Sequence, residues 1–285
     1  MKRINRVNIQ QALHHANEQL GTSSPSPLLD AQILLSFVLH CNSAHLIAWP
    51  DKTLNEEQLS RYLLLVKQRN RGHPVAHLTG TKEFWSLDFF VDNSTLIPRP
   101  ETETLIEFTL DNFSENKRLK LLDMGTGSGA IAISIASERA EWEIIACDIS
   151  EQALVLANKN SLFHQTKNIS LINSDWFSNI KDNNFDIIIS NPPYIETDDP
   201  HLSQGDVRFE PASALTAGET GMDDIEQLCS QAKGYLTKGG TLIIEHGYNQ
   251  KQKVFDCFTK NSFEKIEQKQ DLSGHVRMTV GKRKL

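Results

Sequence analysis

The sequence predicts an α/β protein: a doubly wound, mostly parallel sheet with an antiparallel edge strand, preceded by a small helical domain and a β-hairpin. Three observations support this class. Residues 1–75 carry only helical patterns, whereas from residue 100 short apolar runs alternate with helical segments, as in parallel sheets. A glycine-rich turn also stands between the first of these apolar runs and a helical segment, the order required at a ligand-binding turn.

Residues 1–75 are expected to form a wholly helical domain. One helix is expected over 8–20, and a second after Ser26-Pro27, because serine caps helices and proline suits the first helical position. A third is expected from Asn55. It places four apolar residues on one stripe, which indicates packing in a core: Leu59, Tyr62, Leu63 and Val66.

A hairpin is expected to link this domain to the next one, over residues 76–98. Residues 81–97 are rich in aromatic and β-branched side chains around an Asp-Asn-Ser turn, a composition typical of paired strands.

Residues 99–285 are expected to form the domain with the large sheet. Strands are expected at 119–124, 143–148, 169–173, 185–190 and 241–246, and helices at 101–113, 129–139, 150–162, 222–237 and 248–259. Residues 263–281 are expected to add two more strands and supply the antiparallel edge.

Composition excludes several classes of protein. A net charge of −7 argues against broad binding to nucleic-acid phosphates, which needs a basic surface. The polar start and the lack of long apolar runs predict neither a secretory signal nor a membrane span. The four cysteines form no C-x-x-C pair and the ten histidines show no ligand spacing, so no metal is expected and a reducing cytoplasm fits. A monomer is expected.

The first strand of the large sheet runs into Gly125-Thr126-Gly127-Ser128-Gly129 and then into an apolar helix. Glycines allow a tight turn and bring backbone N–H groups close to a ligand at a helix N-terminus. Asp148 ends the second strand, at the usual distance for a carboxylate that binds ribose hydroxyls. Asp123 precedes the turn. Capping of a helix or loop is the alternative reading of both aspartates.

The strand at 185–190 ends at Asn191-Pro192-Pro193-Tyr194. The Asn191 carbonyl oxygen accepts two hydrogen bonds, and the prolines remove two competing backbone donors. Tyr194 adds an aromatic face for a planar group. The tetrapeptide therefore suits a planar NH2 group, either an amide or the exocyclic amine of a base, although a strand-ending turn has the same composition.

Two cofactors fit the glycine-rich turn. Gly125, Gly127 and Ala130 also satisfy the dinucleotide pattern. We favour S-adenosylmethionine, because it suits an acidic residue at the strand end, here Asp123, and because an NH2-binding tetrapeptide has a use in methyl transfer but none in hydride transfer. Trp176 follows the third strand and would lie beside the adenine, where stacking contributes ~1–3 kcal/mol; an ordinary packed tryptophan is the alternative.

These motifs resemble those of class I S-adenosylmethionine-dependent amino-methyltransferases, whose domain is a Rossmann-like version of the doubly wound sheet. Further segments narrow the resemblance to the peptide chain release factor N5-glutamine methyltransferases of the PrmC/HemK type: PVAHLTG (74–80), LIPRPETE (96–103), VRFEPASAL (207–215) and GMDDIEQL (221–228). The resemblance covers nearly the whole chain. One departure is Glu245-His246-Gly247, where the family tends to read Glu-Ile-Gly, so a role for Glu245 is less secure.

The resemblance implies methylation of the glutamine in the Gly-Gly-Gln loop of class 1 release factors, with S-adenosylhomocysteine as the second product. It also implies a helical domain that docks this protein substrate. The methyl donor would contact Gly125 to Gly129, Asp148, Trp176 and Asn191, in addition to Asp123. The glutamine would be held by Asn191, Pro192, Pro193 and Tyr194, of which Asn191, Pro192 and Tyr194 are the catalytic candidates.

Three other functions are weighed against this one. A glutamine methyltransferase that acts on a ribosomal protein would share the same chemistry. A DNA adenine N6-methyltransferase would need a basic groove, which the net charge of −7 disfavours. A non-catalytic cofactor-binding module is disfavoured by the intact tetrapeptide.

Arg99, Glu101 and Glu103 are open to two interpretations. Pro100 suits a first helical position, and glutamates in a first turn favour the helix dipole. A contact on the substrate side is the alternative.

Overall fold

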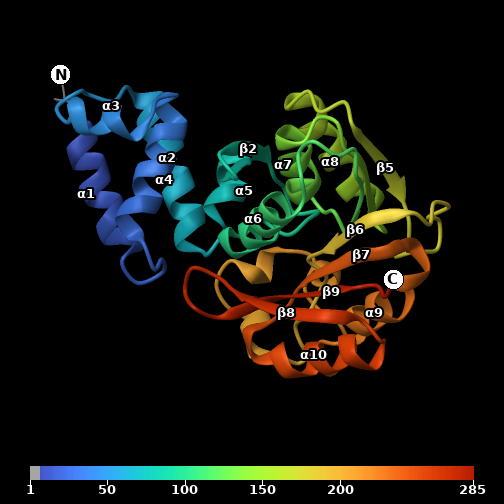
Figure 1. Cartoon of the computed structure of the whole chain (residues 1–285). Coiled ribbons are helices and arrows are strands. Elements are labelled where there is room, and N and C mark those ends of the chain that lie inside the picture. The colour runs from blue at the N-terminus through green and yellow to red at the C-terminus, as the bar shows by residue number, and fades with distance from the viewer. Residues whose placement is uncertain (1–6) are drawn as a thin grey trace, which may run out of the picture. The chain divides into compact units, whose positions relative to one another are not determined.

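The computed structural model describes residues 7–285 (Figure 1). They form two compact units: residues up to Thr81 together with Ser203–Phe209, and Lys82–Leu202 together with Glu210–Leu285. The sequence did not indicate that Ser203–Phe209 belongs to the first unit, because this depends on contacts with residues far away along the chain. No helix among residues 7–285 is both long and apolar enough to cross a membrane.

The first unit is built from helices α1 (Ile9–Leu20), α2 (Pro27–Leu39), α3 (Ser43–Ala48), α4 (Glu56–Asn70) and α5 (Val75–Thr79). α1 and α4 each begin at an asparagine capping box, Asn8 and Asn55. α2 begins after Ser26 as predicted, but the Ser26 hydroxyl donates to Asp30 (3.3 Å) instead of capping the backbone. Of the predicted stripe on α4, Tyr62 and Val66 are buried in the core.

Two ion pairs of the buried Arg69 connect three parts of this unit. The Arg69 Nε lies 2.6 Å from Asp30 Oδ2, and its Nη1 lies 2.6 Å from Asp206 Oδ1. Asp30 lies on α2, Arg69 on α4 and Asp206 in the segment Ser203–Phe209. The arginine thereby attaches this remote segment to the helices.

The second unit contains a seven-stranded sheet in the order β5-β4-β3-β6-β7-β9-β8. Its strands are β3 (Lys120–Met124), β4 (Glu143–Asp148), β5 (Ile169–Asn173), β6 (Phe185–Ser190), β7 (Leu236–Glu245), β8 (Glu264–Gln270) and β9 (Val276–Lys282). Strands β3 to β7 pair in parallel, and β9 is antiparallel to both β7 and β8. The predicted doubly wound sheet with an antiparallel edge is confirmed.

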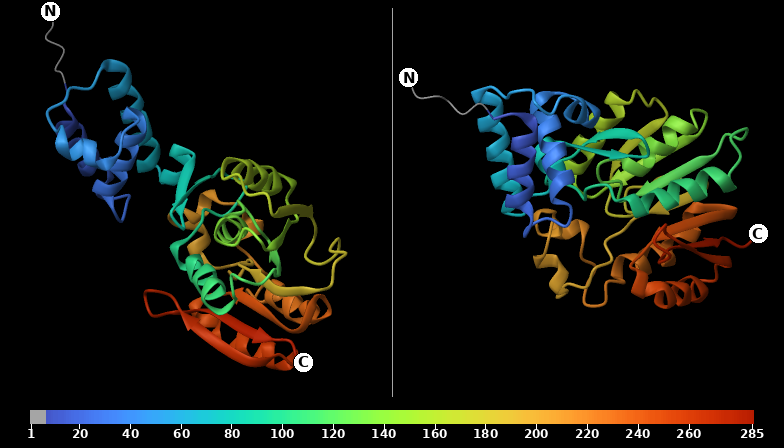
Figure 2. Two further views of the ribbon diagram at one scale, coloured as in Figure 1. Left: turned by 45° about the horizontal axis from the view of Figure 1, so that its top comes forward. Right: turned by 90° about the vertical axis from the view of Figure 1, so that its left-hand side faces the viewer.

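Helices cover both faces of this sheet (Figures 1 and 2). α6 (Glu103–Asn112) and α7 (Ala130–Glu138) pack on one face, with α8 (Glu151–Phe163) beside α7. α9 (Asp223–Tyr235) and α10 (Lys251–Lys260) pack on the other. Successive strand residues face opposite layers: Leu122 belongs to the core under α9 and α10, and Leu121 to the core under α7.

The hairpin is present, but its turn was predicted at the wrong place. Strands β1 (Thr81–Phe84) and β2 (Leu87–Phe90) are joined by Trp85-Ser86, not by the Asp-Asn-Ser segment at 92–94. Both turn residues have positive φ, 52° and 56°, which is unusual for these residue types. Contacts from the helices hold them: the Trp85 N–H donates to Glu103 (2.9 Å) and its indole N–H to Glu138 (3.1 Å).

Candidate active site

The glycine-rich turn and the Asn-Pro-Pro-Tyr segment emerge side by side from the sheet. They follow β3 and β6, which are neighbours paired at Met124 and Ser190. The Ser190 hydroxyl donates to the Met124 carbonyl oxygen (2.7 Å) in the buried end of this pair. Gly125 and Asn191 therefore leave adjacent strands at the carboxyl edge, where doubly wound sheets bind ligands.

The turn requires its glycines. Gly125, Gly127 and Gly129 have φ values of 70°, 56° and 84°, a region that side-chain-bearing residues seldom adopt. Asp148 at the end of β4 stabilises the turn, because its Oδ2 accepts the Gly127 N–H (2.9 Å) while its Oδ1 accepts the Ser150 N–H (2.9 Å). The carboxylate has about four acceptor sites in all, so it can also accept a ligand hydroxyl.

Asp123 lies beneath the turn and not on the cavity wall. Its Oδ2 accepts the hydroxyl hydrogen of Thr126 (2.6 Å). Burial raises the pKa of Asp123 to about 7, and the nearby Asp148 charge adds to this, while the Thr126 bond opposes it. Asp123 thus supports the loop from below, and a direct contact with the methyl donor stays a prediction.

The raised pKa of Asp123 makes stability depend on pH. Folded Asp123 holds its proton up to pH about 7, whereas the ordinary pKa is 3.8. Its contribution to the free energy of unfolding is therefore fully present below pH 3.8 and is lost as the pH rises through about 7. Asp123→Asn cannot titrate and should lose less stability between pH 5 and pH 8 than the wild type, measured by urea unfolding. Asp256→Asn, at an exposed aspartate, is the control, and a D123N variant with the wild-type difference would contradict this.

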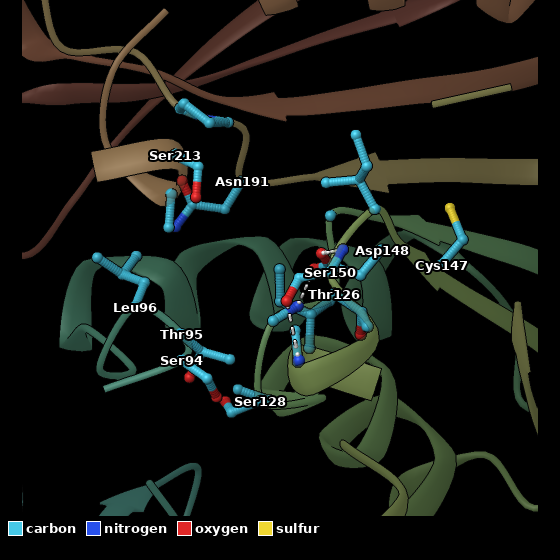
Figure 3. A pocket seen from close by; sticks show the side chains of 18 of the residues that line it. Ser94, Thr95, Leu96, Thr126, Ser128, Cys147, Asp148, Ser150, Asn191 and Ser213 are labelled. Carbon is cyan, nitrogen blue, oxygen red and sulfur yellow. Dashed lines mark hydrogen bonds between the residues drawn. The ribbon is translucent and has the colours of Figure 1, made fainter. Parts of the chain in front are cut away.

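A cavity of about 390 Å³ opens at this edge of the sheet, a size typical of small-molecule sites. In Figure 3 the side chains of Asn191 and Ser213 lie on one side of it, and those of Thr126, Asp148 and Ser150 on another. Of the predicted site residues, eight line this cavity: Gly125, Thr126, Gly127, Ser128, Asp148, Trp176, Asn191 and Pro193. Gly129 instead packs against α7 and α8, where a Cβ would lie 2.7 Å from Ile133.

The cavity fits the predicted methyl donor. A turn of backbone N–H groups, a carboxylate and an aromatic ring meet in it, and these suit an amino-acid tail, ribose hydroxyls and an adenine. The Trp176 ring lies against the turn, since a Cβ on Gly125 would be 3.7 Å from it. Among residues 7–285, no group of three or more His, Cys, Asp or Glu side chains could hold a metal ion.

A hydrogen bond fixes the Trp176 ring: its indole N–H donates to Asp224 Oδ1 (3.1 Å). The Trp176 backbone has a left-handed conformation, with φ 45°. Asp224 lies in the first turn of α9, half-buried on the cavity wall. The Asp223-Asp224 pair therefore begins a helix, and Asp224 also positions an aromatic ring.

Replacement of Trp176 tests whether its ring binds the adenine. Trp176→Ala should raise the Kd for S-adenosylmethionine by about 5- to 150-fold, equivalent to ~1–3 kcal/mol of stacking. Trp176→Phe keeps an aromatic face and should raise it less. Isothermal titration calorimetry would measure both, with Trp49→Ala, 60% exposed, as control. Unchanged affinity in W176A would assign the ring a packing role only.

The two polar atoms of the Asn191 side chain have different surroundings. Its Nδ2 donates to Thr102 Oγ1 (3.1 Å), while its Oδ1 is buried without a hydrogen-bond partner among residues 7–285. Buried acceptors are seldom left unpaired, so this oxygen is suited to a ligand N–H.

The rest of the tetrapeptide is placed differently. Pro193 lines the cavity, whereas Pro192 is buried and neither Pro192 nor Tyr194 is on its wall. The Tyr194 hydroxyl lies 3.5 Å from Glu245 Oε1, and burial raises its pKa. Substrate contacts by Pro192 and Tyr194 stay predictions.

Several cavity residues were not found from the sequence. Thr95 has a buried hydroxyl without a partner among residues 7–285 and lines the cavity. Thr102, inside the segment LIPRPETE, holds Asn191. The VRFEPASAL segment contributes Ser213 and Ala214. The sequence pointed to Thr102, Ser213 and Ala214 only through the two family-like segments that contain them. A single residue such as Thr95 has no pattern in the sequence that indicates a binding site.

The polar residues around Pro100 have structural partners. Arg99 Nη2 lies 2.6 Å from Glu210 Oε1, which connects the two quoted segments. Pro100 begins a 3-10 turn as predicted, and Glu103 binds the hairpin turn. Arg99 also lines the cavity, so a contact on the substrate side stays open for it.

Comparisons with known proteins show which family this chain belongs to. Residues 102–276 match the family described as methyltransferase small domain, and residues 11–80 match the PrmC N-terminal domain. A release factor glutamine methyltransferase of Shewanella oneidensis is 44% identical over 96% of this chain and 96% of its own length. That of Escherichia coli is 44% identical over 96% and 98%. The crystal structure of a methyltransferase from Pyrococcus furiosus shares the fold, with a TM-score of 0.53 at 15% identity, over 79% of this chain and 100% of that one.

Proposed function

Because the chain belongs to the family of release factor glutamine methyltransferases, we propose that it transfers a methyl group from S-adenosylmethionine to a release factor. The acceptor is the side-chain amide nitrogen (N5) of the glutamine in the Gly-Gly-Gln loop of class 1 release factors, and S-adenosylhomocysteine is the second product. One observation carries this proposal: the buried Asn191 Oδ1 has no hydrogen-bond partner within residues 7–285, and Asn191 lines the same cavity as the glycine-rich turn.

The residues that would hold the methyl donor are those of the turn, with Asp148 and Trp176. Backbone N–H groups of the turn suit the carboxylate of the amino-acid tail. The Asp148 carboxylate suits the ribose hydroxyls, and the Trp176 ring suits the adenine. When bound, S-adenosylmethionine supplies an electrophilic sulfonium methyl group.

The Asn191 side chain addresses the chemical difficulty of the reaction. An amide nitrogen is a poor nucleophile, because its lone pair is delocalised into the carbonyl. If Asn191 Oδ1 and the Pro192 carbonyl oxygen accept its two N–H bonds, both interactions strengthen as positive charge grows on nitrogen, which stabilises the transition state. Alignment of the nitrogen in the cavity could contribute a further ~7–11 kcal/mol. The tetrapeptide contains no strong base, so the proton leaves after attack.

The relatives' names favour a release factor over the other acceptors. A ribosomal-protein glutamine would need the same carboxamide contact, so only the docking surfaces separate these two substrates. A net charge of −7 disfavours duplex DNA. We place the reaction in the cytoplasm and expect a monomer; all four cysteines are free, in keeping with a reducing compartment.

The decisive experiment offers three acceptors separately to the protein with labelled S-adenosylmethionine: a class 1 release factor, a ribosomal-protein substrate and duplex DNA. Peptide mass spectrometry should locate one added methyl group on the glutamine of the Gly-Gly-Gln loop. A release factor with that glutamine replaced by leucine is the control. Label in DNA, but none in the loop, would overturn the proposal.

A further inference from the structure

The orientation of the Asn191 carboxamide is a separate requirement of the proposed reaction. Rotation about the Cβ–Cγ bond exchanges its oxygen and its NH2 group, which have nearly the same shape. Only one orientation presents an acceptor to the glutamine NH2 group. The other would set two NH2 groups against each other, so a catalyst of this kind needs a partner that selects the orientation.

Thr102 occupies the position from which this selection can be made. It ends the 3-10 turn Pro100–Thr102, is 5% exposed and lines the cavity. Its Oγ1 lies 3.1 Å from Asn191 Nδ2. A hydroxyl can accept or donate, so Thr102 by itself would tolerate either orientation of the carboxamide.

The Glu245 carboxyl group determines which role the hydroxyl takes. Glu245 ends β7 and is buried, 1% exposed. Its Oε1 lies 3.5 Å from the Tyr194 hydroxyl, and its Oε2 is a buried acceptor without a hydrogen-bond partner among residues 7–285. The neighbouring Thr102 side chain acts to lower the pKa of Glu245, as a hydroxyl that donates to the carboxylate does. A carboxylate can only accept. When Glu245 is ionised, the Thr102 hydrogen is therefore directed to it, and Oγ1 is left as an acceptor for Asn191 Nδ2–H.

We infer that Thr102 is a positioning residue for methyl transfer, and that it holds the Asn191 carboxamide with its oxygen toward the cavity because Glu245 takes the Thr102 hydroxyl hydrogen. This inference rests on the proposed function, since it gives the orientation a purpose. Neither Thr102 nor Glu245 is assigned a contact with the reacting atoms; both act through Asn191.

The same arrangement makes the orientation sensitive to pH. Burial raises the pKa of Glu245 to about 7, and the charge of Glu101 in the 3-10 turn acts in the same direction. Thr102, Arg277 of β9 and Tyr194 lower this pKa, but their effect is smaller than that of burial. A protonated carboxyl group can donate to Thr102, which frees the hydroxyl to donate to Asn191 Oδ1 and reverses the carboxamide. Activity that depends on this orientation is therefore expected to fall as the pH drops through about 7.

Kinetics of single variants test the inference at pH 8. Thr102→Val keeps the shape but removes the hydroxyl, and should lower kcat by about 10- to 100-fold, the scale of effects from misplaced groups, with an unchanged Kd for S-adenosylmethionine. Thr102→Ser should retain most of the activity. Thr109→Val is the matched control, because Thr109 is also buried and its hydroxyl donates to the Leu105 carbonyl oxygen within α6 (2.7 Å), away from the cavity. Thr102→Val in an Asn191→Ala background should cause no further loss.

Glu245→Gln supplies a second test, in which residue 102 keeps its hydroxyl and only the group beside it changes. Glutamine cannot ionise and can donate to the hydroxyl, so kcat at pH 8 should fall and its decrease between pH 8 and pH 6 should disappear. The inference is overturned if T102V turns over like the active wild type, if its loss adds fully to that of N191A, or if E245Q keeps the wild-type pH profile.

A readout without turnover separates this inference from the proposed function. The side-chain amide signal of Asn191, identified in ¹⁵N NMR spectra by its loss in Asn191→Ala, should shift in T102V and stay unchanged in T109V. Failure of the wild type to methylate any release factor would refute the proposed function alone. An Asn191 signal unaffected by T102V would refute the inference alone.

Discussion

Asn191→Ala is expected to lower kcat for methyl transfer by about 10²–10³-fold, the range found when one transition-state hydrogen-bonding group is removed. The variant loses the buried Oδ1 that is proposed to accept an N–H bond from the glutamine. The interaction strengthens as the nitrogen becomes positive, so its loss affects the transition state more than the bound substrate. Steady-state kinetics with a release factor would measure this effect.

The Kd for S-adenosylmethionine should remain nearly that of the wild type, because the turn, Asp148 and Trp176 are unchanged. Asn179→Ala is the matched control, since Asn179 is an exposed asparagine whose amide donates to the Asn173 carbonyl oxygen (2.9 Å). Near-normal turnover by N191A would refute the assignment of Asn191, and a parallel loss of cofactor affinity would show that the substitution damages the whole cavity.

Arg69→Ala is expected to destabilise the helical unit by about 3–5 kcal/mol, the effect of removing one member of a buried ion pair. The Arg69 and Asp30 side chains are 5% and 8% exposed. Without the guanidinium group, the Asp30 carboxylate would stay buried with only the Ser24 and Ser26 hydroxyls as hydrogen-bond donors. Arg69→Lys should recover only part of the stability, because one ammonium group cannot reproduce the fork geometry with two carboxylates.

Urea unfolding and amide hydrogen exchange would measure this effect. Protection should fall in α1, α2 and α4 and in Ser203–Phe209, which Arg69 connects through Asp206. Lys269→Ala is the control, since its pair with Glu267 is 42% and 56% exposed, and such pairs contribute about 0–1 kcal/mol. Equal protection in R69A and wild type would mean that packing alone holds the segment to the helices.

The sheet could be predicted because its strands are short apolar runs with few polar interruptions. FDIIIS (185–190) became β6 without a change of bounds. The hairpin turn could not be placed, because a turn at Trp85-Ser86 violates local residue preferences and depends on Glu103 and Glu138. Local sequence carries no information about such distant carboxylates.

The part of the candidate site that could be predicted is the part whose residues have a fixed spacing from the strands. Glycines at 125, 127 and 129 and the carboxylate of Asp148 have a required spacing relative to β3 and β4. Thr95 and Thr102 have no such spacing. They belong to the site only because folding places the Thr95 side chain beside Gly127 and the Thr102 hydroxyl beside Asn191.

The sequence by itself determined the doubly wound sheet, the glycine-rich turn and the acceptor tetrapeptide, because periodicity and backbone preference act over a few residues. Only the tertiary structure decided that Asp123 supports the turn from below, that Tyr194 faces Glu245 and that Thr102 holds Asn191. The direction of a side chain at the edge of the sheet depends on which distant groups fill the space around it, and residue order does not specify that.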